Sequence, residues 1–302
     1  MRKNTFPAIV LLIVACLILT CALSACSPKT KKPPTTTGSA GTIQTQPPVG
    51  SNPDQPDPDE IISIKDPELE KIIRTELSRA EGDLTAGDML QLKDLRIRGD
   101  DYPVVDLDGL EYALNLSYFS ASDVTLSSFE PVTRLAKINY FGFSYAELAT
   151  TPSEFDMPVL ESATFIDTNI SDFAFLKNTP LGDVIFTDCG ISSIEFLRDM
   201  KNLTDVYLDD NEITDLSPLR GKTAIISLSL HMNEISDLSA LSECTALERL
   251  NISYNHVTNL EPIMTLPALR ELTAYEELDK KIIDRGQIET LIARGVVVDY
   301  HK

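Results

Sequence analysis

The sequence predicts an α/β solenoid, in which similar coils stack and share one parallel β-sheet. First, the block Asn-Glu-Ile-Thr-Asp-Leu at residues 211–216 recurs, with small changes, at 233–238 and 255–260, a spacing of 22 residues. Second, alternating apolar residues precede each block, as in a short strand with one buried face. Third, another apolar pair follows each block. One such unit cannot bury its apolar side alone, so the units are expected to stack.

The apolar pattern of each unit reads L-x-x-L-x-L-x-x-N-x-I, as at Leu203, Val206, Leu208 and Asn211. In the same register, earlier units begin near Leu181, Leu160, Ile138, Leu116 and Leu92, and a last strand begins at Leu269. The pattern resembles leucine-rich repeats, whose 22-residue form is typical of bacterial internalins. The resemblance implies a right-handed horseshoe with the parallel sheet on its concave face, 3-10 or irregular segments on its convex side, and a helical N-terminal cap.

The repeated asparagines are expected to form a structural ladder, because a buried amide can satisfy the backbone groups of a turn. These residues are Asn211, Asn233 and Asn255. Cys189 takes the same position in an earlier unit and Cys244 falls at a convex apolar position. Both are predicted to be buried, unpaired thiols. The unit at 138–159 fits the convex pattern poorly and is expected to be irregular there.

The N-terminus carries a predicted export signal. Arg2 and Lys3 precede an apolar run from residue 8 to 23, which ends in Leu-Ser-Ala-Cys26. This ending resembles the lipobox of bacterial lipoproteins. The resemblance implies a signal peptide over 1–25, lipid attachment (palmitate among the acyl chains) at Cys26, and a lipid-anchored protein on the outside of a bacterial cell membrane. An ordinary signal peptide or an uncleaved anchor is the alternative.

The remaining segments divide by composition. Residues 26–59 hold eight of the 18 prolines, with many threonines, and are predicted to be a lipid-anchored, disordered tether. Residues 60–91 are a predicted helical cap, in which Asp66-Pro67 and Thr85 begin helices. The repeats follow over 92–278, and a C-terminal cap over 279–302 with a helix at 287–294 and a strand at 296–298.

Charge and residue types exclude several functions. The 302 residues include 46 acidic and 26 basic ones, for a net charge of −20, so nucleic-acid binding is not expected. None of the three histidines has a Cys or Ser partner at a recognisable spacing. Neither a zinc motif nor a phosphate-binding loop is present. The sequence therefore predicts no enzyme and no cofactor.

Outward strand positions should line the concave face. Aromatic residues and Met point outward there, and such residues are favoured in protein interfaces. Tyr118, Tyr140 and Tyr145 belong to earlier units. The predicted partner-binding residues are Asp183, Asp205, Tyr207, Asp209, His231, Met232, Arg249, Tyr254 and Tyr275. Among these, Tyr207, Met232 and Tyr254 are the expected apolar anchors, whereas the three aspartates are expected to match charge on the partner.

The acidic residues leave three interpretations open. Asp183 and Asp205 occupy equivalent positions in adjacent units, where like charges repel. They can form a solvated acidic surface, bind a basic partner, or bridge a calcium ion, although no known calcium-loop spacing is present.

The sequence thus predicts a lipid-anchored cell-surface protein that binds another protein through its concave face, in adhesion or within the envelope. Two other functions stay open. One is a structural scaffold within an envelope complex, and the other is a wall-active hydrolase that would use paired carboxylates as acid and base.

Overall fold

A computed structural model of the chain describes residues 56–152, 155–275 and 283–300. The predicted signal peptide, Cys26 and the tether up to residue 55 lie outside the described residues, as do the ends of the predicted repeat region and of the C-terminal cap. No helix within the described ranges is long and apolar enough to cross a bilayer.

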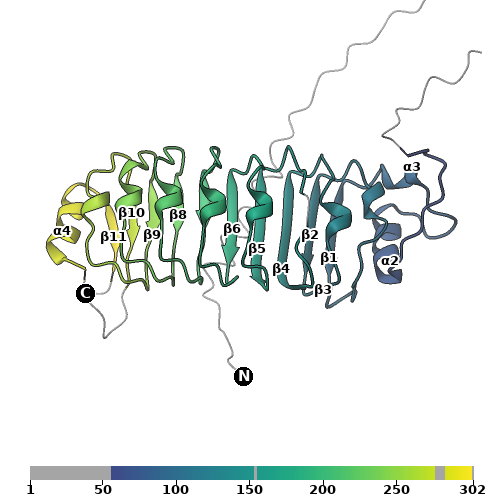
Figure 1. Ribbon diagram of the computed structural model, residues 1–302, viewed down its shortest axis with the longest axis horizontal. Coiled ribbons are helices and arrows are strands. Elements are labelled where there is room, and N and C mark those ends of the chain that lie inside the picture. Colours follow the sequence, from purple (N-terminus) through teal and green to yellow (C-terminus); the bar gives the residue numbers. More distant parts are fainter. Residues whose placement is uncertain (1–55, 153–154, 276–282, 301–302) are drawn as a thin grey trace, which may run out of the picture. The chain divides into compact units, whose positions relative to one another are not determined.

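A parallel sheet runs along the whole stack of coils (Figure 1). The strands follow one another in chain order, except that β3 pairs only with the end of β4. Pairing is in register, so that Asp183 in β6 lies opposite Asp205 in β7. The strands are β1 (Asp94–Arg98), β2 (Tyr118–Ser122), β3 (Thr125–Leu126), β4 (Tyr140–Leu148), β5 (Ser162–Thr168), β6 (Asp183–Thr187), β7 (Asp205–Tyr207), β8 (Ser227–Ser229), β9 (Arg249–Asn251), β10 (Glu271–Thr273) and β11 (Val297–Asp299).

Short 3-10 helices form most of the return segments. They are η2 (Leu110–Tyr112), η3 (Glu130–Val132), η4 (Ala174–Leu176), η5 (Glu195–Leu197), η6 (Ser217–Leu219), η7 (Ser239–Glu243) and η8 (Glu261–Ile263). The predicted solenoid of parallel strands and 3-10 returns is therefore confirmed. In the unit at 138–159, the described residues after β4 contain no helix, which agrees with its poor convex pattern.

The interior of the stack is apolar, and phenylalanines fill its central coils. Phe173 and Phe186 are fully buried and lie face to face, with ring centroids 4.5 Å apart. Phe165 packs edge-on against both of them. Large rings span the space between the sheet and the 3-10 side in these coils, so the interior is continuous from coil to coil.

Helix α2 (Pro67–Glu76) begins where Asp66-Pro67 predicts it. One carboxylate oxygen of Asp66 accepts the backbone N–H groups of Glu68 and Leu69, and the other accepts that of Val105 at 2.7 Å. The same side chain therefore caps the helix and joins it to the first coil. Helix α3 (Ala86–Met89) begins with a reciprocal capping box between Thr85 and Asp88.

At the other end, helix α4 spans Arg285–Ala293 and β11 adds the last strand. The helix begins two residues before the predicted start, because Asp284 accepts the backbone N–H of Gly286 and acts as its N-cap. Both ends of the sheet thus lie beside helical segments (Figure 1).

The repeated asparagines sit inside the turns. Asn233 accepts the backbone N–H of Ile213 at 3.0 Å and donates to the carbonyls of Leu208 and Leu230. Asn211 and Asn255 form the same set of bonds, one coil earlier and one coil later. Each amide therefore joins its own turn to the preceding coil.

Cys189 and Cys244 are both buried and unpaired. The thiol of Cys189 lies 3.4 Å from the hydroxyl of Thr168 and also approaches the carbonyls of Phe165 and Thr187. Burial raises the pKa of Cys189 and raises that of Cys244 to about 11. Both groups are therefore protonated, weakly reactive thiols at neutral pH.

Candidate functional site

The candidate site is the outward surface of strands β1 to β10 and of the residues that directly follow each strand, called here the sheet face. Because the strands pair in register, each outward position forms a column across neighbouring coils. The residues predicted to bind a partner fall on the half of this surface formed by β6 to β10.

Arg249 of β9 is the centre of a polar network on that half. Its guanidinium donates to the hydroxyl of Ser227 in β8 at 2.6 Å and lies 3.8 Å from the carboxylate of Asp205 in β7. The Tyr207 side chain also bonds Ser227, and burial is the main cause that raises the pKa of this tyrosine. Ser227 is buried beneath these longer side chains. Because its guanidinium lies near the carboxylate of Asp205, Arg249 partly neutralises that charge.

Asp183 occupies the neighbouring position in β6. Its carboxylate accepts the hydroxyl of Thr204 at 2.9 Å and that of Ser162 at 3.4 Å. No basic side chain within the described ranges forms an ion pair with it. Asp183 therefore keeps its negative charge on the sheet face.

The structure corrects the position expected for Asp209. Asp209 is only 9% exposed, because its carboxylate turns back toward the next coil. There it accepts hydrogen bonds from the hydroxyl of Ser229 at 2.5 Å and from the backbone N–H of His231 at 2.8 Å. Burial raises the pKa of Asp209 and lowers that of the adjacent His231 imidazole. Asp209 is thus a structural link between coils and not a surface charge.

His231, Tyr254 and Tyr275 lie together in three successive coils. The rings of His231 and Tyr254 meet edge to face, with centroids 5.1 Å apart. The backbone N–H of Tyr254 donates to the carbonyl of Tyr275, and the N–H of Tyr275 donates to Ser253 Oγ. His231 and Tyr254 therefore form an aromatic pair, and the backbone of Tyr275 joins the next coil to them.

In each of the seven coils from β2 to β9, one residue at or near the end of the strand has a left-handed backbone, with φ between 49° and 56°. The backbone N–H of this residue donates to the next coil, as from Met232 to the carbonyl of Ser253 at 2.9 Å. This left-handed column consists of Asp123, Tyr145, Asp167, Asp188, Asp210, Met232 and Tyr254. Its aspartates lie close enough to repel, since burial and then a neighbouring carboxylate raise the pKa values of Asp188 and Asp210.

The other half of the sheet face carries a stack that the sequence did not reveal. The guanidinium of Arg96 lies 4.3 Å from the ring centroid of Tyr118, and that ring stacks on Tyr140 at 4.4 Å and 3°. Desolvation raises the pKa of Tyr140 to about 12. The tyrosines stand 22 residues apart, so their spacing was a usable signal, whereas nothing in the repeat pattern identified Arg96.

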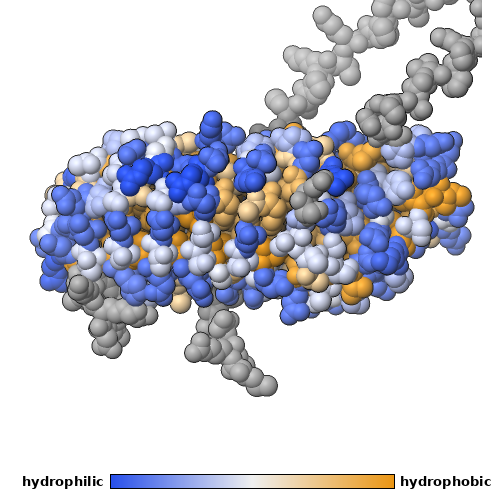
Figure 2. All heavy atoms as spheres, viewed as in Figure 1, coloured by the Kyte–Doolittle hydropathy of each residue, from blue (hydrophilic) through white to orange (hydrophobic). Residues whose placement is uncertain are grey.

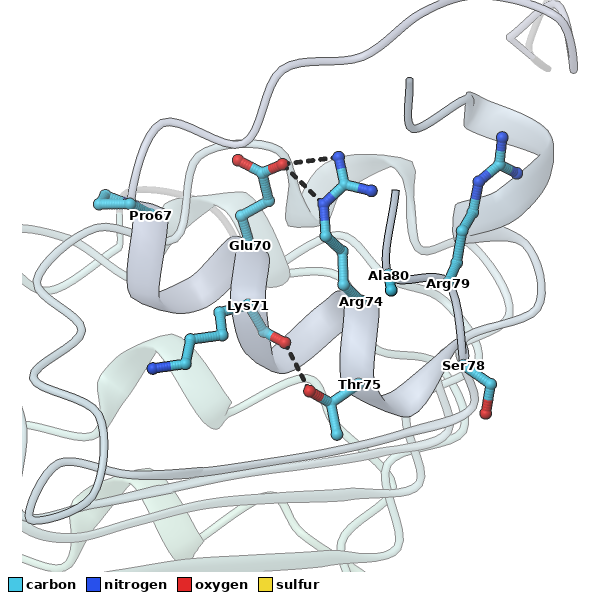
Figure 3. Close-up of a pocket in the computed structure, with 8 residues that line it drawn as sticks. All are labelled: Pro67, Glu70, Lys71, Arg74, Thr75, Ser78, Arg79 and Ala80. Atoms are coloured by element: carbon cyan, nitrogen blue, oxygen red, sulfur yellow. Dashed lines mark hydrogen bonds and ion pairs between the residues drawn. The ribbon is translucent and has the colours of Figure 1, made fainter. Parts of the chain in front are cut away.

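A depression of about 450 Å³ lies on the cap helix α2 (Figure 3). Arg74 pairs with Glu70, Lys71 with Glu68, and Arg79 with a carboxylate of α3. The lining residues are Pro67, Glu70, Lys71, Arg74, Thr75, Ser78, Arg79 and Ala80. Its charged groups are therefore engaged in holding the cap together.

Metal binding gains no geometric support. Among residues 56–152, 155–275 and 283–300, no three His, Cys, Asp or Glu side chains are grouped so that they could hold a metal ion. We therefore assign no calcium site to the stacked aspartates.

Comparisons with known proteins show the fold. No protein-family model and no curated protein sequence matches the chain. Among solved structures, internalin C2 from Listeria monocytogenes is 22% identical with a TM-score of 0.55, over 78% of this chain and 93% of the other. An internalin-like protein from the same organism is 15% identical with a TM-score of 0.49, over 70% and 68%. The repeats, the parallel sheet and the likeness to internalin C2 show that the chain has the leucine-rich-repeat fold.

Proposed function

We propose that the chain binds another protein through the sheet face, with Met232, Tyr254 and Tyr207 as its apolar contacts. The observation that carries this proposal is the exposure of apolar side chains in the left-handed column. Met232 is 48% exposed and Tyr254 is 36% exposed. Aromatic residues and Met are enriched at the centres of protein interfaces.

The backbone at these positions strengthens the argument. A left-handed conformation costs a residue with an ordinary side chain about 1 kcal/mol, whereas Asp is tolerated there. Four of the seven coils in this column carry Asp, and the other three carry Tyr or Met. Met232 and Tyr254 thus carry a local backbone cost while a third to a half of each residue stays exposed, which leaves apolar surface for a partner to bury.

Exposure alone would not distinguish this surface. In the view of Figure 2, hydrophilic residues cover most of the stack and hydrophobic residues show between them, which is ordinary for a soluble surface. Met232 and Tyr254 differ from the other exposed apolar residues in two ways. They are adjacent in one column, and the ring of Tyr254 also meets that of His231 edge to face. Hot spots of interfaces cluster in this way.

The likeness to internalin C2 supports a binding function over a catalytic one, as an analogy of fold. Repeat solenoids present extended surfaces of stacked residues to their partners. We further propose, from the lipobox resemblance at Cys26, that a lipid anchor holds the protein on the outside of a bacterial membrane.

The test has two steps. Crosslinking on intact cells, with a photoreactive residue in place of Asn251 or Thr273, identifies the partner. The affinity of the purified partner is then measured for the Met232→Ala/Tyr254→Ala double variant, which we expect to bind about 10- to 100-fold more weakly.

Val105→Ala/Val159→Ala serves as the matched control, because both valines are exposed and lie off the sheet face. The control should bind as the wild-type chain does. Equal affinity of both double variants for the partner would rule out this surface. Radiolabelled palmitate incorporation with and without Cys26→Ala tests the anchor separately.

A further inference from the structure

A buried carboxylate lies next to the proposed apolar contacts. Asp209 is 9% exposed, and its carboxylate accepts the hydroxyl of Ser229 and the backbone N–H of His231. His231 directly precedes Met232 in the chain, and its ring meets that of Tyr254 edge to face. A partner that covers Met232 and Tyr254 therefore also covers the pair of Asp209 and His231.

The link between these coils does not need a charged acceptor. Asp209, His231, Ser253 and Tyr275 occupy equivalent positions in four successive coils, 22 residues apart. The neutral hydroxyl of Ser253 accepts the backbone N–H of Tyr275 at 3.1 Å, which repeats the bond from the N–H of His231 to Asp209. Ser253 is only 1% exposed. A buried hydroxyl thus forms the same link without the cost of burying a charge.

The neighbouring coils supply no cation for the buried carboxylate. Asp210, next in the chain, opposes its ionisation, and Asp188 in the preceding coil acts in the same sense on Asp210. In the following coil, Tyr254 contacts the imidazole, whereas the Arg249 guanidinium is directed to Ser227 and Asp205. Within the described ranges, no basic side chain forms an ion pair with the buried carboxylate. The imidazole is therefore the adjacent group that can take up a positive charge.

The pair is suited to take up a proton in mildly acidic solution. Burial raises the pKa of Asp209 above its ordinary value of 3.8 and lowers that of His231 below 6.5. The two values therefore move toward each other, and the first proton belongs to the pair. The pair carries one negative charge before it takes up this proton and no net charge afterwards, whichever group holds the proton.

We propose that the pair of Asp209 and His231 makes binding at the sheet face sensitive to pH, with tighter binding in mildly acidic than in neutral solution. Covering a net negative pair costs a partner more than covering a neutral pair, so binding favours the protonated pair. This inference rests on the proposed function and adds its regulation. A single proton limits the effect to about tenfold in affinity per pH unit.

The first measurement needs no partner. The full chain, which has three histidines, is prepared with isotope-labelled histidine and titrated by NMR from about pH 7.5 to about pH 4.5. His231→Gln identifies the His231 signal. Asp209→Asn keeps an oxygen that accepts both hydrogen bonds but cannot ionise. Because the charge of Asp209 raises the pKa of His231, the midpoint of the His231 titration should fall in Asp209→Asn, and an unchanged midpoint would overturn the inference.

The second measurement uses the partner identified by crosslinking. Its affinity for the wild-type chain should be about 3- to 10-fold higher at about pH 5.5 than at about pH 7.5. Asp209→Asn should lose most of this ratio and bind at the higher pH nearly as tightly as the wild type does at the lower pH. Glu289→Gln is the control, because it removes one exposed carboxylate on α4 and should keep the wild-type ratio. Far-UV circular dichroism verifies that every variant is folded at both pH values.

The outcomes separate this inference from the proposed function. If Asp209→Asn keeps the wild-type ratio while Met232→Ala/Tyr254→Ala binds weakly, the binding face stands and the pH sensitivity is overturned. If the double variant binds as the wild type does, the proposed function is overturned, and this inference with it. A ratio that Glu289→Gln reduces as much as Asp209→Asn would attribute the effect to net charge and would also overturn the inference.

Discussion

Replacing Asn233 by alanine tests the physical basis of the stack. Asn233 is 4% exposed, and its amide forms bonds to two coils. Its oxygen accepts the backbone N–H of Ile213, and its nitrogen donates to the carbonyls of Leu208 and Leu230. Alanine removes all of these bonds, because its methyl group can neither accept nor donate a hydrogen bond.

The magnitude follows from the groups that are left behind. The N–H of Ile213 would be buried with no acceptor, which costs about 1–3 kcal/mol. Each of the two lost bonds to Leu208 and Leu230 contributes about 1 kcal/mol more. We therefore expect Asn233→Ala to lower the free energy of unfolding by about 3–5 kcal/mol. Because adjacent coils stabilise one another, this loss should shift the transition of the whole stack.

The assay is urea unfolding at neutral pH, followed by far-UV circular dichroism and extrapolated to water. Asn202→Ala is the matched control, because Asn202 is exposed and its amide donates only to the carbonyl of Pro180 at 3.2 Å. It should cost less than about 1 kcal/mol. If the two variants lose the same free energy, the buried amide does not join the coils as argued.

Three other variants probe the core, the acidic column and the stacked tyrosines. Phe173→Ala should lower the free energy of unfolding by about 3–5 kcal/mol in urea unfolding, since its ring is fully buried in the centre of the stack; a loss below 1 kcal/mol would contradict this. Burial and a neighbouring carboxylate raise the pKa of Asp210 above its ordinary value of 3.8, so this group's stabilising effect is complete below 3.8 and is lost as the pH rises through the raised pKa. Asp210→Asn should therefore stabilise the chain in urea unfolding at pH 7, with a difference that shrinks toward pH 4; an equal difference at both pH values would contradict this. Gly142→Ala should displace the ring of Tyr140 and alter the near-ultraviolet circular dichroism, which tyrosine dominates because the chain has no Trp; an unchanged spectrum would show that the ring does not lie there.

The predicted repeat register placed residues in the correct columns. The spacing of Asn211 and Asn233 implied equivalent turns, and both asparagines form the same bonds in successive coils. Asp66 was likewise identifiable as a helix cap, because Asp before Pro is a local signal that depends on few neighbours. In each case the deciding interaction lies within one coil or is repeated from coil to coil.

The candidate site was less accessible to prediction. Alternation placed Asp209 and Tyr207 alike on the outward side, yet Asp209 turns under its neighbours and is buried, whereas Tyr207 is only half-buried. The stack of Arg96 on Tyr118 also went unseen, because Arg96 belongs to the first coil and has no equivalent in the later repeats. These outcomes depend on the lengths of side chains in adjacent coils, which the repeat pattern does not contain.

By itself, the sequence determined the period of the chain, the direction of stacking and the residues that share a column. A repeat length of 22 residues with one apolar side leaves stacking as the way to bury that side. Only the tertiary structure decided which outward residues remain exposed, which carboxylates are neutralised, and where the left-handed backbone presents Met232 and Tyr254. The physical reason is that exposure and electrostatic pairing are properties of three or more coils in contact, whereas periodicity is a property of each coil alone.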